Sequence, residues 1–403
     1  MPGNIGVSIR ESIGERIGVS ITGDGMAGNA ENAGNGKGRV LVAGFATRHV
    51  ATSAHNAGYE VHSVDSFCDL DLAAVTESRT RFTELSELQG AVEDVCRRMH
   101  FDIIAATSCA ESLDLSSVGQ KICGSDPKVA AYFLDKKNIQ DFFEKNGIPC
   151  PKILPKGVYP AMIKPCNGAG GWRNKRAENA RDEAEWCSLW ENEPYIRQEL
   201  VEGVPCSVSC LSDGKKAVAV SFNEQLLRGG SGERAYGFSG AVTPFKHPLE
   251  SEIVRCAERA VALSGCVGSV GVDFVAADDR FWAIEINPRF QATMDVVEKA
   301  CGINLFQAHV DASRGILPHA YTGEYRQYAA RKVIFADRDM TVKDDLLKCG
   351  DVAAGIADIP APGTVIEEGG AVLSVYGEGA SRAEALESLD KTIRKVNRYI
   401  CRW

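Results

Sequence analysis

The chain has 403 residues, of which 44% are hydrophobic and 25% are charged. This length predicts two or three domains, and this composition is typical of a globular protein with an ample core. The formal net charge is −9 and basic residues do not cluster, so we expect no nucleic-acid partner. No apolar run approaches the ~20 residues that span a bilayer, so we expect no membrane partner.

The 14 cysteines are scattered singly and form no CxxC pair. We therefore expect reduced, mostly buried thiols in a cytoplasmic protein, and neither a disulfide framework nor a zinc site. Residues 1–38 are rich in Gly, Asn, Ser and Glu, and the pattern of residues 5–9 recurs at 17–21. This segment is predicted to be a flexible extension outside the folded domains.

Residues 39–125 alternate between apolar runs and helical patterns, which predicts a doubly wound α/β domain with a parallel sheet. Strands are expected at residues 39–44, 59–65, 101–106 and 121–124. Ligands of such sheets bind at the carboxyl ends of the strands. Arg48 follows the first strand and Glu111 the third, so they are candidates for holding a substrate carboxylate and an ammonium group. Ordinary surface charges near a helix start would explain them equally well.

Residues 126–192 are predicted to form a smaller unit. A helix begins at Asp135-Lys136 and ends at Gly147, and a strand over 159–165 carries Lys164 near its end. A loop over 167–173 follows and contains Gly168, Gly170 and Gly171. Such glycines let backbone N–H groups approach an anion closely, and the lysine adds a positive charge. A plain glycine-rich turn is the alternative.

Residues 193–325 are predicted to form a larger unit, with strands at 195–203, 206–211, 216–220 and 223–227, a helix at 248–264 and helical structure over 291–320. The segment 228–240 is rich in glycine and contains Arg228, Arg234 and Tyr236. It suits a mobile loop over a site, with these side chains as further substrate-binding candidates. Residues 326–403 predict a C-terminal mixed α/β segment with strands at 328–335 and 371–377 and a closing helix at 381–400.

A hairpin is predicted over residues 269–289, with a polar tip at 278–280. Two sets of apolar side chains are expected to face a core: Val270, Val272 and Phe274 on the first strand, and Trp282, Ile284 and Ile286 on the second. The opposite face carries Asp273, Glu285 and Asn287, and symmetry about Asp279 would set Asp273 across from Glu285. Opposed like charges destabilise a sheet, and a hard cation between them would remove that effect. These oxygen ligands suit Mg²⁺, although a solvated hairpin with scattered acids would give the same pattern.

The order of these motifs along the chain resembles the ATP-grasp superfamily. The motifs are Asp135-Lys136, Gly147-Ile148-Pro149, Ile163-Lys164-Pro165 with its glycine loop, Arg197 to Gly203, Asp273, and Glu285 to Arg289. The tail, with Pro362-Gly363-Thr364 and Ser381 to Ala385, is similar to the biotin-carboxylase-like branch, and the whole is similar to archaeal predicted ATP-dependent carboligases. The resemblance implies an ATP-grasp fold of mixed α/β and α+β class, between an N-terminal doubly wound α/β domain and a C-terminal mixed α/β segment.

The resemblance also implies roles for residues by position. Lys136 and Lys164 would hold the phosphates of ATP, and the loop 167–173 would cover them. Gln198, Glu199 and Val201 match the linker that reads adenine. Asp273, Glu285 and Asn287 match the ligands of Mg²⁺ (or Mn²⁺), and Arg289, with Lys164, would act on the transferring phosphoryl group. Pro205 stands where many relatives have the acid that binds ribose, which leaves Glu202 as a substitute.

The activity implied is an ATP-dependent ligation of a small carboxylate to a small amine through an acyl phosphate, with ADP and phosphate as products. The joined molecules are expected to be amino-acid-like. A homodimer would be in keeping with the relatives. A carboxylase that activates bicarbonate is the first alternative, but the position of its catalytic glutamate, four residues past Arg289, is Thr293. A non-catalytic ATP-binding module is the second alternative, although the retention of Lys136, Lys164 and the metal carboxylates argues against it.

Overall fold

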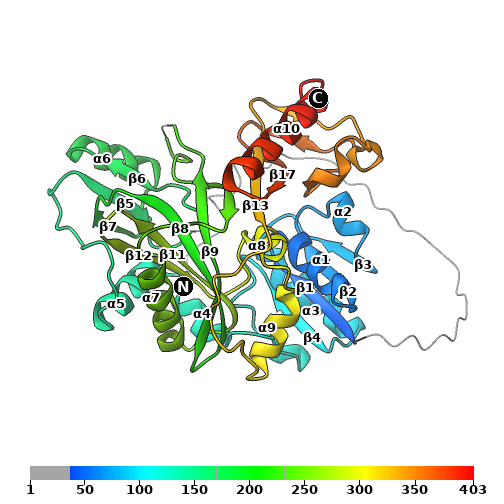
Figure 1. Ribbon diagram of the computed structural model, residues 1–403, viewed down its shortest axis with the longest axis horizontal. Helices are drawn as coiled ribbons and strands as arrows, with labels where there is room; N and C mark the ends of the chain where they lie inside the picture. Colours follow the sequence, from blue (N-terminus) through cyan, green and yellow to red (C-terminus); the bar gives the residue numbers. More distant parts are fainter. Residues whose placement is uncertain (1–36, 169, 231) are drawn as a thin grey trace, which may run out of the picture.

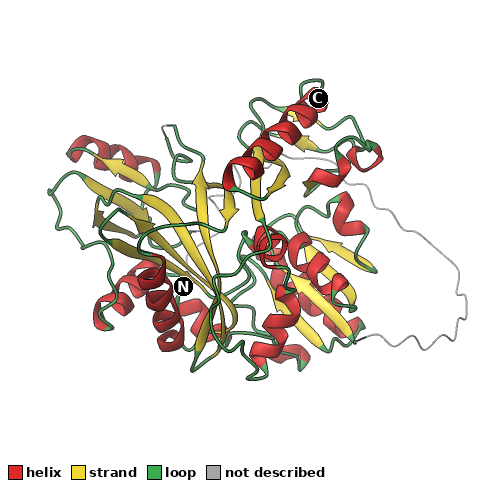
Figure 2. Ribbon diagram, viewed as in Figure 1, coloured by secondary structure: helices red, strands yellow, loops and turns green. Residues whose placement is uncertain are grey.

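The structure is a computed structural model that describes residues 37–168, 170–230 and 232–403 (Figure 1). The extension expected over residues 1–38 therefore lies, except for its last two residues, outside the described residues. Four β-sheets organise the described part of the chain. Figure 2 shows that helices flank the two larger sheets and that α10 lies near the C-terminal end of the molecule. The class is thus mixed α/β, as predicted.

The N-terminal part forms a parallel sheet in the order β3–β2–β1–β4. Its strands are β1 (Arg39–Ala43), β2 (Glu60–Asp65), β3 (Ser78–Arg81) and β4 (Ile103–Ala106), and its helices are α1 (Arg48–Asn56), α2 (Leu70–Ala73) and α3 (Leu88–Arg98). Side chains of β1 alternate between two cores: Val40 and Val42 pack with α1, and Leu41 and Ala43 pack with α3. This burial on both faces explains the continuous apolar run, and it confirms the predicted parallel sheet.

Two details of this sheet differ from the prediction. The strand expected at residues 121–124 is absent, because Cys123 donates one backbone hydrogen bond to Ile104 and no ladder continues from it. The edge strand β3 was not predicted, because its sequence Ser-Arg-Thr-Arg has no apolar alternation. An edge strand needs little burial, so the hydrophobic pattern does not indicate it.

A small antiparallel sheet in the order β6–β5–β7 follows. Its strands are β5 (Ala161–Pro165), β6 (Lys175–Ala177) and β7 (Tyr195–Glu199), and its helices are α4 (Pro127–Tyr132), α5 (Lys136–Lys145) and α6 (Ala180–Leu189). The start of α5 is as predicted: the Asp135 side chain accepts a hydrogen bond from the backbone N–H of Lys137. This cap fixes Lys136 in the first turn of α5, beside the end of β5.

The largest sheet has eight strands in the order β12–β11–β8–β9–β10–β13–β17–β15, all antiparallel. They are β8 (Val204–Asp213), β9 (Ala217–Leu227), β10 (Phe238–Thr243), β11 (Val267–Ala276), β12 (Phe281–Asn287), β13 (Tyr328–Phe335), β15 (Ile356–Ala357) and β17 (Ala371–Gly379). The remaining elements are α7 (Glu250–Ser264), α8 (Met294–Cys301), α9 (Leu305–Ser313), α10 (Arg382–Ile400) and the pair β14 (Met340–Thr341) and β16 (Val365–Ile366). The sheet thus runs across the domain boundary expected at residue 325.

Three segments of this region differ from the prediction. Residues 216–220 and 223–227 belong to the single strand β9, because the polar side chains that interrupted the apolar pattern lie on one face of a continuous strand. The predicted loop 228–240 ends early, where β10 begins. The helical stretch predicted over 291–320 is two helices that end at Ser313.

The two faces of the large sheet have different chemistry over β8, β9 and β11. One face is apolar and packs against α5 and α7, with Val208, Val270, Val272 and Phe274 fully buried. The opposite face carries Ser207, Ser209, Asn223 and Asp273. The segment after β12 covers part of it: a Cβ at Gly271 would lie 1.6 Å from the Gln291 side chain, so this close approach requires glycine. The candidate site lies on this polar face.

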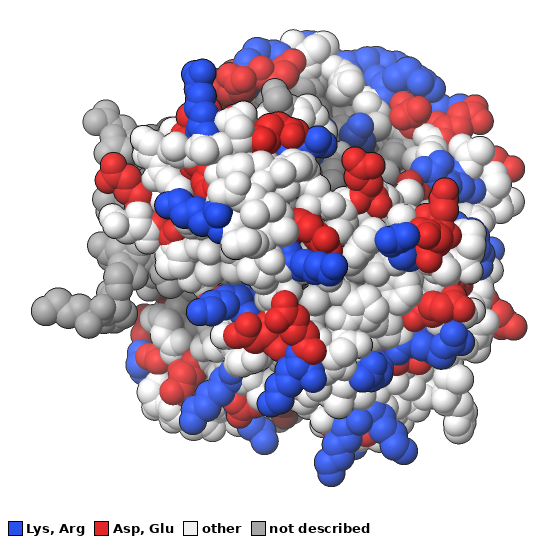
Figure 3. Space-filling view, turned by 90° about the vertical axis from the view of Figure 1, so that its left-hand side faces the viewer, with Lys and Arg blue, Asp and Glu red and all other residues white. Residues whose placement is uncertain are grey.

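No helix in the described ranges is long and apolar enough to cross a membrane. On the molecular face shown in Figure 3, basic and acidic side chains are interspersed.

Candidate active site

The predicted hairpin is β11–β12, and Asp273 pairs with Glu285 as expected. The register shifts directly below this pair, where Phe274 faces Ala283, so Ile284 is an extra residue that forms a β-bulge. The bulge reverses the faces of residues 281–283, which lie between it and the hairpin tip. Ala283 is therefore buried in the core, and Ile286, beyond the bulge, is buried there as predicted. The prediction that Trp282 and Ile284 face that core was wrong.

The Asp273 carboxylate is held by two side-chain amides. Its Oδ1 accepts a hydrogen bond from Gln225 Nε2 at 2.9 Å, and its Oδ2 accepts one from Asn287 Nδ2 at 3.1 Å. Burial, followed by the neighbouring charge of Glu285, raises the pKa of Asp273 to about 7. A cation between the two carboxylates would oppose both effects, so the electrostatics of the pair fit a metal ion.

The donor set at this position fits Mg²⁺ in particular. Two carboxylates and an amide offer hard oxygen ligands. The set is small, since the described residues contain no group of three or more His, Cys, Asp or Glu side chains that could hold a metal ion. Mg²⁺ is usually bound by one or two carboxylates together with substrate phosphates and water, so a complete protein cage is not required.

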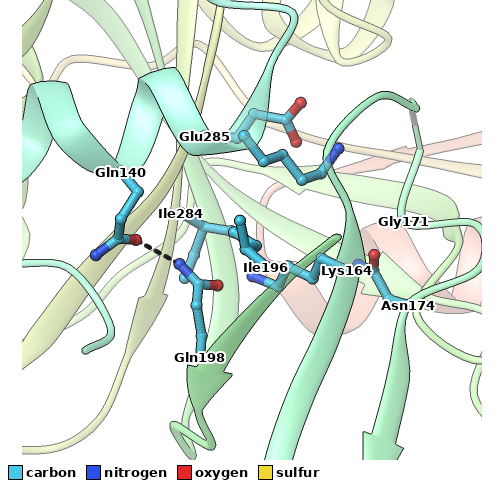
Figure 4. A pocket seen from close by; sticks show the side chains of 9 residues that line it. Gln140, Lys164, Gly171, Asn174, Ile196, Gln198, Ile284 and Glu285 are labelled. Atoms are coloured by element: carbon cyan, nitrogen blue, oxygen red, sulfur yellow. Dashed lines mark hydrogen bonds between the residues drawn. The ribbon is translucent and has the colours of Figure 1, made fainter. Parts of the chain in front are cut away.

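A small cavity of about 30 Å³ lies beside Glu285, the cross-strand partner of Asp273 (Figure 4). It is lined by Lys136 and Gln140 of α5, Lys164 of β5, Gly171 and Asn174 of the glycine loop, Ile196 and Gln198 of β7, and Ile284 and Glu285 of β12. The fold thus brings together both predicted phosphate lysines, the predicted adenine-reading Gln198 and a predicted metal ligand. Ligand pockets usually measure about 300–1,000 Å³, so this cavity is smaller than a typical ligand pocket.

The two lysines lie close enough for the charge of Lys136 to act on Lys164. Lys164 is 8% exposed, and burial followed by the charge of Lys136 lowers its pKa to about 8, although Glu285 opposes this shift. Lys136 Nζ donates a hydrogen bond to the backbone carbonyl of Gly168 at 2.8 Å. An anionic ligand would relieve the repulsion and desolvation at Lys164, so the pocket fits phosphate groups.

The residues of the predicted adenine linker differ in their environment. Gln198 Nε2 donates to Gln140 Oε1 at 2.6 Å, shown dashed in Figure 4, whereas Gln198 Oε1 is buried with no partner among the described residues. This acceptor fits an exocyclic amino group of a base. Glu199 Oε1 accepts from the backbone N–H of Lys152 at 3.0 Å, and Val201 and Glu202 do not line the cavity.

The glycine loop 167–173, of which residue 169 is outside the described residues, is anchored at its far end. The Arg173 guanidinium lies over the rings of Trp172 and Trp190 and pairs with Glu193 at 3.0 Å. Gly171 has φ +72°, and a Cβ there would lie 2.1 Å from the backbone oxygen of Tyr236. The glycine loop thus packs on the predicted second loop, and only glycine fits at this contact.

Arg289 connects the metal carboxylates to the N-terminal sheet. Its Nη2 donates to Asn287 Oδ1 at 3.2 Å, its Nη1 to the backbone oxygen of Phe290 at 3.0 Å, and its Nε to Glu111 Oε1 at 2.6 Å. Glu111 follows β4 and is 5% exposed. The structure therefore brings the substrate candidate Glu111 to the predicted phosphoryl-transfer residues.

Arg48 occupies a different environment from the one predicted. It is 5% exposed, its Nε donates to Asp358 Oδ1 at 2.8 Å, and its Nη1 and Nη2 donate to the Asp295 carboxylate at 2.9 and 2.8 Å. Arg331 also pairs with Asp358, at 3.0 Å. These contacts join α1, α8 and the C-terminal strands, and they argue against the predicted substrate role of Arg48.

The two arginines of the loop 228–240 contact the C-terminal segment. The Arg228 guanidinium lies 3.6 Å from the centre of the Phe335 ring, and its Nη2 donates to the backbone oxygen of Gly369 at 3.1 Å. Arg234 Nη1 donates to the backbone oxygen of Glu368 at 3.4 Å. Neither residue lines the cavity in this structure, so their substrate role stays a prediction.

Five residues of the site were not predicted from the sequence: Gln140, Asn174, Ile196, Gln225 and Ile284. A signal existed for Gln225, because Ser221, Asn223 and Gln225 occupy alternate positions and mark a polar face of β9. Ile284 reaches the cavity only because of the bulge, for which the sequence has no marker. Gln140 points inward from α5 because its neighbours Ile139 and Phe143 fix the orientation of that helix in the core.

Comparisons with known proteins agree with this geometry. A family model for the ATP-grasp domain matches residues 133–293. The biotin carboxylase domain of Hydrogenobacter thermophilus 2-oxoglutarate carboxylase, determined with MgADP, ADP and bicarbonate, is similar with a TM-score of 0.69 and 12% identity, covering 88% of this chain and 89% of that one. N5-carboxyaminoimidazole synthase from Aspergillus clavatus, with ADP and 5-aminoimidazole ribonucleotide, has a TM-score of 0.67 and 17% identity, with 89% and 99% coverage. The L-amino acid ligase from Bacillus licheniformis has a TM-score of 0.66 and 16% identity, with 90% and 98% coverage.

At these identities the structural matches establish a shared fold, and the family model establishes the domain. The matched residues 133–293 contain the cavity, both lysines and the paired carboxylates of the hairpin. Residues 133–293 are therefore an ATP-grasp domain, and the chain has the fold of ATP-grasp proteins of the biotin-carboxylase-like type.

Proposed function

We propose that the protein is an ADP-forming ATP-grasp ligase that joins the carboxylate of one small molecule to the amine of another, with ATP and Mg²⁺ as cofactors. The observation that carries the proposal is the arrangement in one cavity of two phosphate-compatible lysines and Glu285, whose cross-strand partner is the half-buried Asp273. Phosphoryl transfer needs groups that position the phosphates and neutralise charge, and these residues supply them without a protein nucleophile.

The proposed reaction has two steps. An oxygen of the substrate carboxylate attacks the γ-phosphorus of ATP, the bond from that phosphorus to the β,γ-bridging oxygen breaks, and ADP leaves. The amine nitrogen then attacks the acyl carbon, the bond from that carbon to the phosphate oxygen breaks, and phosphate leaves with the amine proton passing to a base. Mg²⁺, when bound at Asp273, Glu285 and Asn287, would neutralise the phosphate oxygens. Lys136, Lys164 and Arg289 would stabilise the charge on the transferring group.

Position 293 favours ligation over carboxylation. Thr293 is 1% exposed and precedes the first turn of α8, so a hydroxyl occupies the place where a bicarbonate-activating enzyme of the biotin carboxylase type has its catalytic glutamate. A threonine hydroxyl is not a base at neutral pH. The amide-forming reaction needs no base at this position, and it is therefore the reaction that this site supports best.

Release of ADP and phosphate from ATP, measured with a panel of carboxylates, amines and bicarbonate, would test this proposal. We expect release that requires both a carboxylate and an amine. Release that requires bicarbonate alone would support the carboxylase alternative. Tight ATP binding without release under any combination would support a non-catalytic ATP-binding module.

The lowered pKa of Lys164 leads to a prediction about ATP binding. With a pKa of about 8, Lys164 is mostly neutral at pH 9 in the free protein, and the phosphates would raise that pKa and charge it. Binding of ATP at pH 9 should therefore take up a proton, up to about one per ATP, which calorimetry in buffers of different ionisation enthalpy would detect. The uptake should vanish in Lys164→Met, and equal binding heats for the wild type in all buffers would contradict the assignment.

The same shift also affects the stability of the free protein. The pKa of Lys164 in the folded state lies below its ordinary value of 10.5, so the unfolded chain holds more protons between pH 8 and 10.5. The contribution of Lys164 to the free energy of unfolding should therefore increase as the pH rises through this window.

A further inference from the structure

Glu111 has a feature that the proposed phosphoryl chemistry does not explain. Its side chain is almost fully buried, with 4% of its surface exposed, and Oε1 accepts the Arg289 Nε hydrogen bond at 2.6 Å. Its second oxygen, Oε2, is shielded from solvent and has no hydrogen-bond partner among the described residues. A buried carboxylate oxygen without a donor is unfavourable, and each such exception in a native structure calls for an explanation, such as a catalytic role or a bound donor.

Arg289 beside it also retains hydrogen-bonding capacity. Nη1 donates to the backbone oxygen of Phe290 and Nη2 to Asn287 Oδ1. Each of these terminal nitrogens carries two hydrogens, so each has one further N–H to donate. The two free N–H groups of a guanidinium are suited to the two oxygens of a carboxylate, and the Arg289 side chain is 16% exposed. The Glu111–Arg289 pair therefore offers an acceptor and a pair of donors side by side.

This pair lies within reach of the proposed reaction. Arg289 donates a hydrogen bond to Asn287, and Asn287 donates one to Asp273. Asp273 in turn faces Glu285 across the hairpin. A carboxylate that binds Arg289 would thus lie next to the groups proposed to hold Mg²⁺ and the γ-phosphate. Glu111 contacts Arg289 from the N-terminal part of the chain. It follows the carboxyl end of β4, and ligands of parallel sheets bind at such ends.

We infer that the acyl donor of the proposed ligase is an α-amino acid, whose carboxylate is held by Arg289 and whose α-ammonium group is held by Glu111 Oε2. The zwitterionic end of an α-amino acid has two acceptor oxygens and an adjacent cationic donor, separated by a single carbon. The two acceptor oxygens match the two free N–H groups of Arg289, and the cationic donor matches the free oxygen Oε2 of Glu111. The inference rests on the proposed ligase function and identifies one of its substrate classes.

The assignment has a chemical consequence. An ammonium group held by a carboxylate keeps its proton, so its nitrogen has no free electron pair and cannot attack an acyl phosphate. The carboxylate oxygen would still attack the γ-phosphorus of ATP, with ADP leaving. The second substrate would then supply the nucleophilic amine. Glu111 would therefore select the acyl donor and also prevent the donor from acting as the acceptor.

Substrate entry requires a local opening, because Oε2 is covered in this structure. Binding of the ammonium group would therefore require a small displacement of the groups that cover this oxygen.

Hydroxylamine, a small amine that converts acyl phosphates to hydroxamates, provides the test. Phosphate release and hydroxamate formation would be measured with α-amino acids and with their des-amino analogues, which have the same carbon skeleton with hydrogen in place of the ammonium group. We expect the wild type to prefer the amino acid by about 10- to 100-fold in kcat/KM, the range for a lost hydrogen bond to a charged group. In Glu111→Gln this preference should fall several-fold, with the KM for ATP unchanged.

Glu60→Gln is the matched control, because Glu60 lies on β2 in the same N-terminal part of the chain, in a partly exposed pair with Arg39. It should retain the wild-type preference. Equal activity of the wild type with amino acids and des-amino analogues, or activity with des-amino acids alone, would overturn the inference and leave the ligase proposal intact. Bicarbonate-dependent release, or no release with any carboxylate, would overturn both. Because the wild type alone decides between these outcomes, a folding defect in Glu111→Gln would not obscure the result.

Discussion

Glu285→Gln is expected to reduce ATP turnover by about a thousandfold while the fold remains intact, because the substitution removes a metal ligand from the phosphoryl-transfer site. Glu285 lines the cavity and faces the half-buried Asp273 across the hairpin. Loss of its charge should also remove the like-charge repulsion that helps to raise the pKa of Asp273. The metal-free variant should therefore be at least as stable as the wild type in thermal unfolding.

The control for this experiment lies on the same hairpin. Asp279 is at the exposed tip, paired only with its neighbour Arg280 among the described residues. Asp279→Asn should leave turnover unchanged. A second readout is the increase in melting temperature on addition of MgATP, which should be present in the wild type and in Asp279→Asn and reduced in Glu285→Gln. Near wild-type kcat in Glu285→Gln would refute the metal assignment.

Arg48→Met is expected to lower the free energy of unfolding by about 3–5 kcal/mol, because it leaves two buried carboxylates without their main partner. Arg48 forms hydrogen bonds with Asp295 and Asp358, and Met retains much of its volume without the charge. Arg331 would still pair with Asp358 at 3.0 Å, so part of the cluster would remain compensated. Chemical denaturation would measure the loss.

The pH dependence of this loss follows from the carboxylates. Despite their burial, the Arg48 guanidinium holds the pKa of Asp295 and that of Asp358 well below the ordinary range, with Arg331 assisting. Groups with lowered folded pKa values stabilise the fold above their unfolded pKa of about 4, and this contribution is lost as the pH falls through the folded value. The difference between wild type and Arg48→Met should thus be largest above about pH 5 and should shrink in more acidic solution.

Arg39→Met is the matched control for Arg48→Met. Arg39 begins β1, shortly before Arg48 in the chain, and pairs with Glu60 at 2.6 Å, but both side chains are more than one-third exposed. Exposed pairs of this kind contribute about 0–1 kcal/mol, so the control should be nearly as stable as the wild type. A loss for Arg48→Met no greater than that for Arg39→Met would contradict a structural role and restore the substrate hypothesis for Arg48.

Features with a local cause were predictable from the sequence. The parallel sheet followed from apolar runs buried on both faces, the start of α5 from the Asp135 cap, and the pairing of Asp273 with Glu285 from the position of the hairpin tip. Each depends on residues that are close in sequence, where periodicity, capping and turn chemistry act. The edge strand β3 and the split of 291–320 into two helices were missed, because a polar edge and a short interruption leave little trace in such patterns.

Features that depend on distant contacts were not predictable in the same way. The neighbours of Arg48, which are Asp295, Asp358 and Arg331, come from three separate segments, and no local pattern marks them as partners. The same holds for the contact of Glu111 with Arg289. A charged residue after a strand has the same sequence signature whether it meets a substrate, a buried ion cluster or solvent, because the difference lies in the packing of other elements.

The order of the motifs along the sequence was enough to predict the ATP-grasp domain, with its lysines and its glycine loop. The opposed carboxylates were predictable as well, because strand alternation and the position of the hairpin tip determine which residues pair. Only the tertiary structure decided three further points. The bulge at Ile284 turned its side chain from the core to the cavity. Packing of α1 against α8 and the C-terminal strands enclosed Arg48 with carboxylates, and the approach of the β4 loop to the hairpin gave Glu111 its place beside Arg289. In each case, the environment of a side chain depends on segments that are far apart in the chain, and folding alone brings them together.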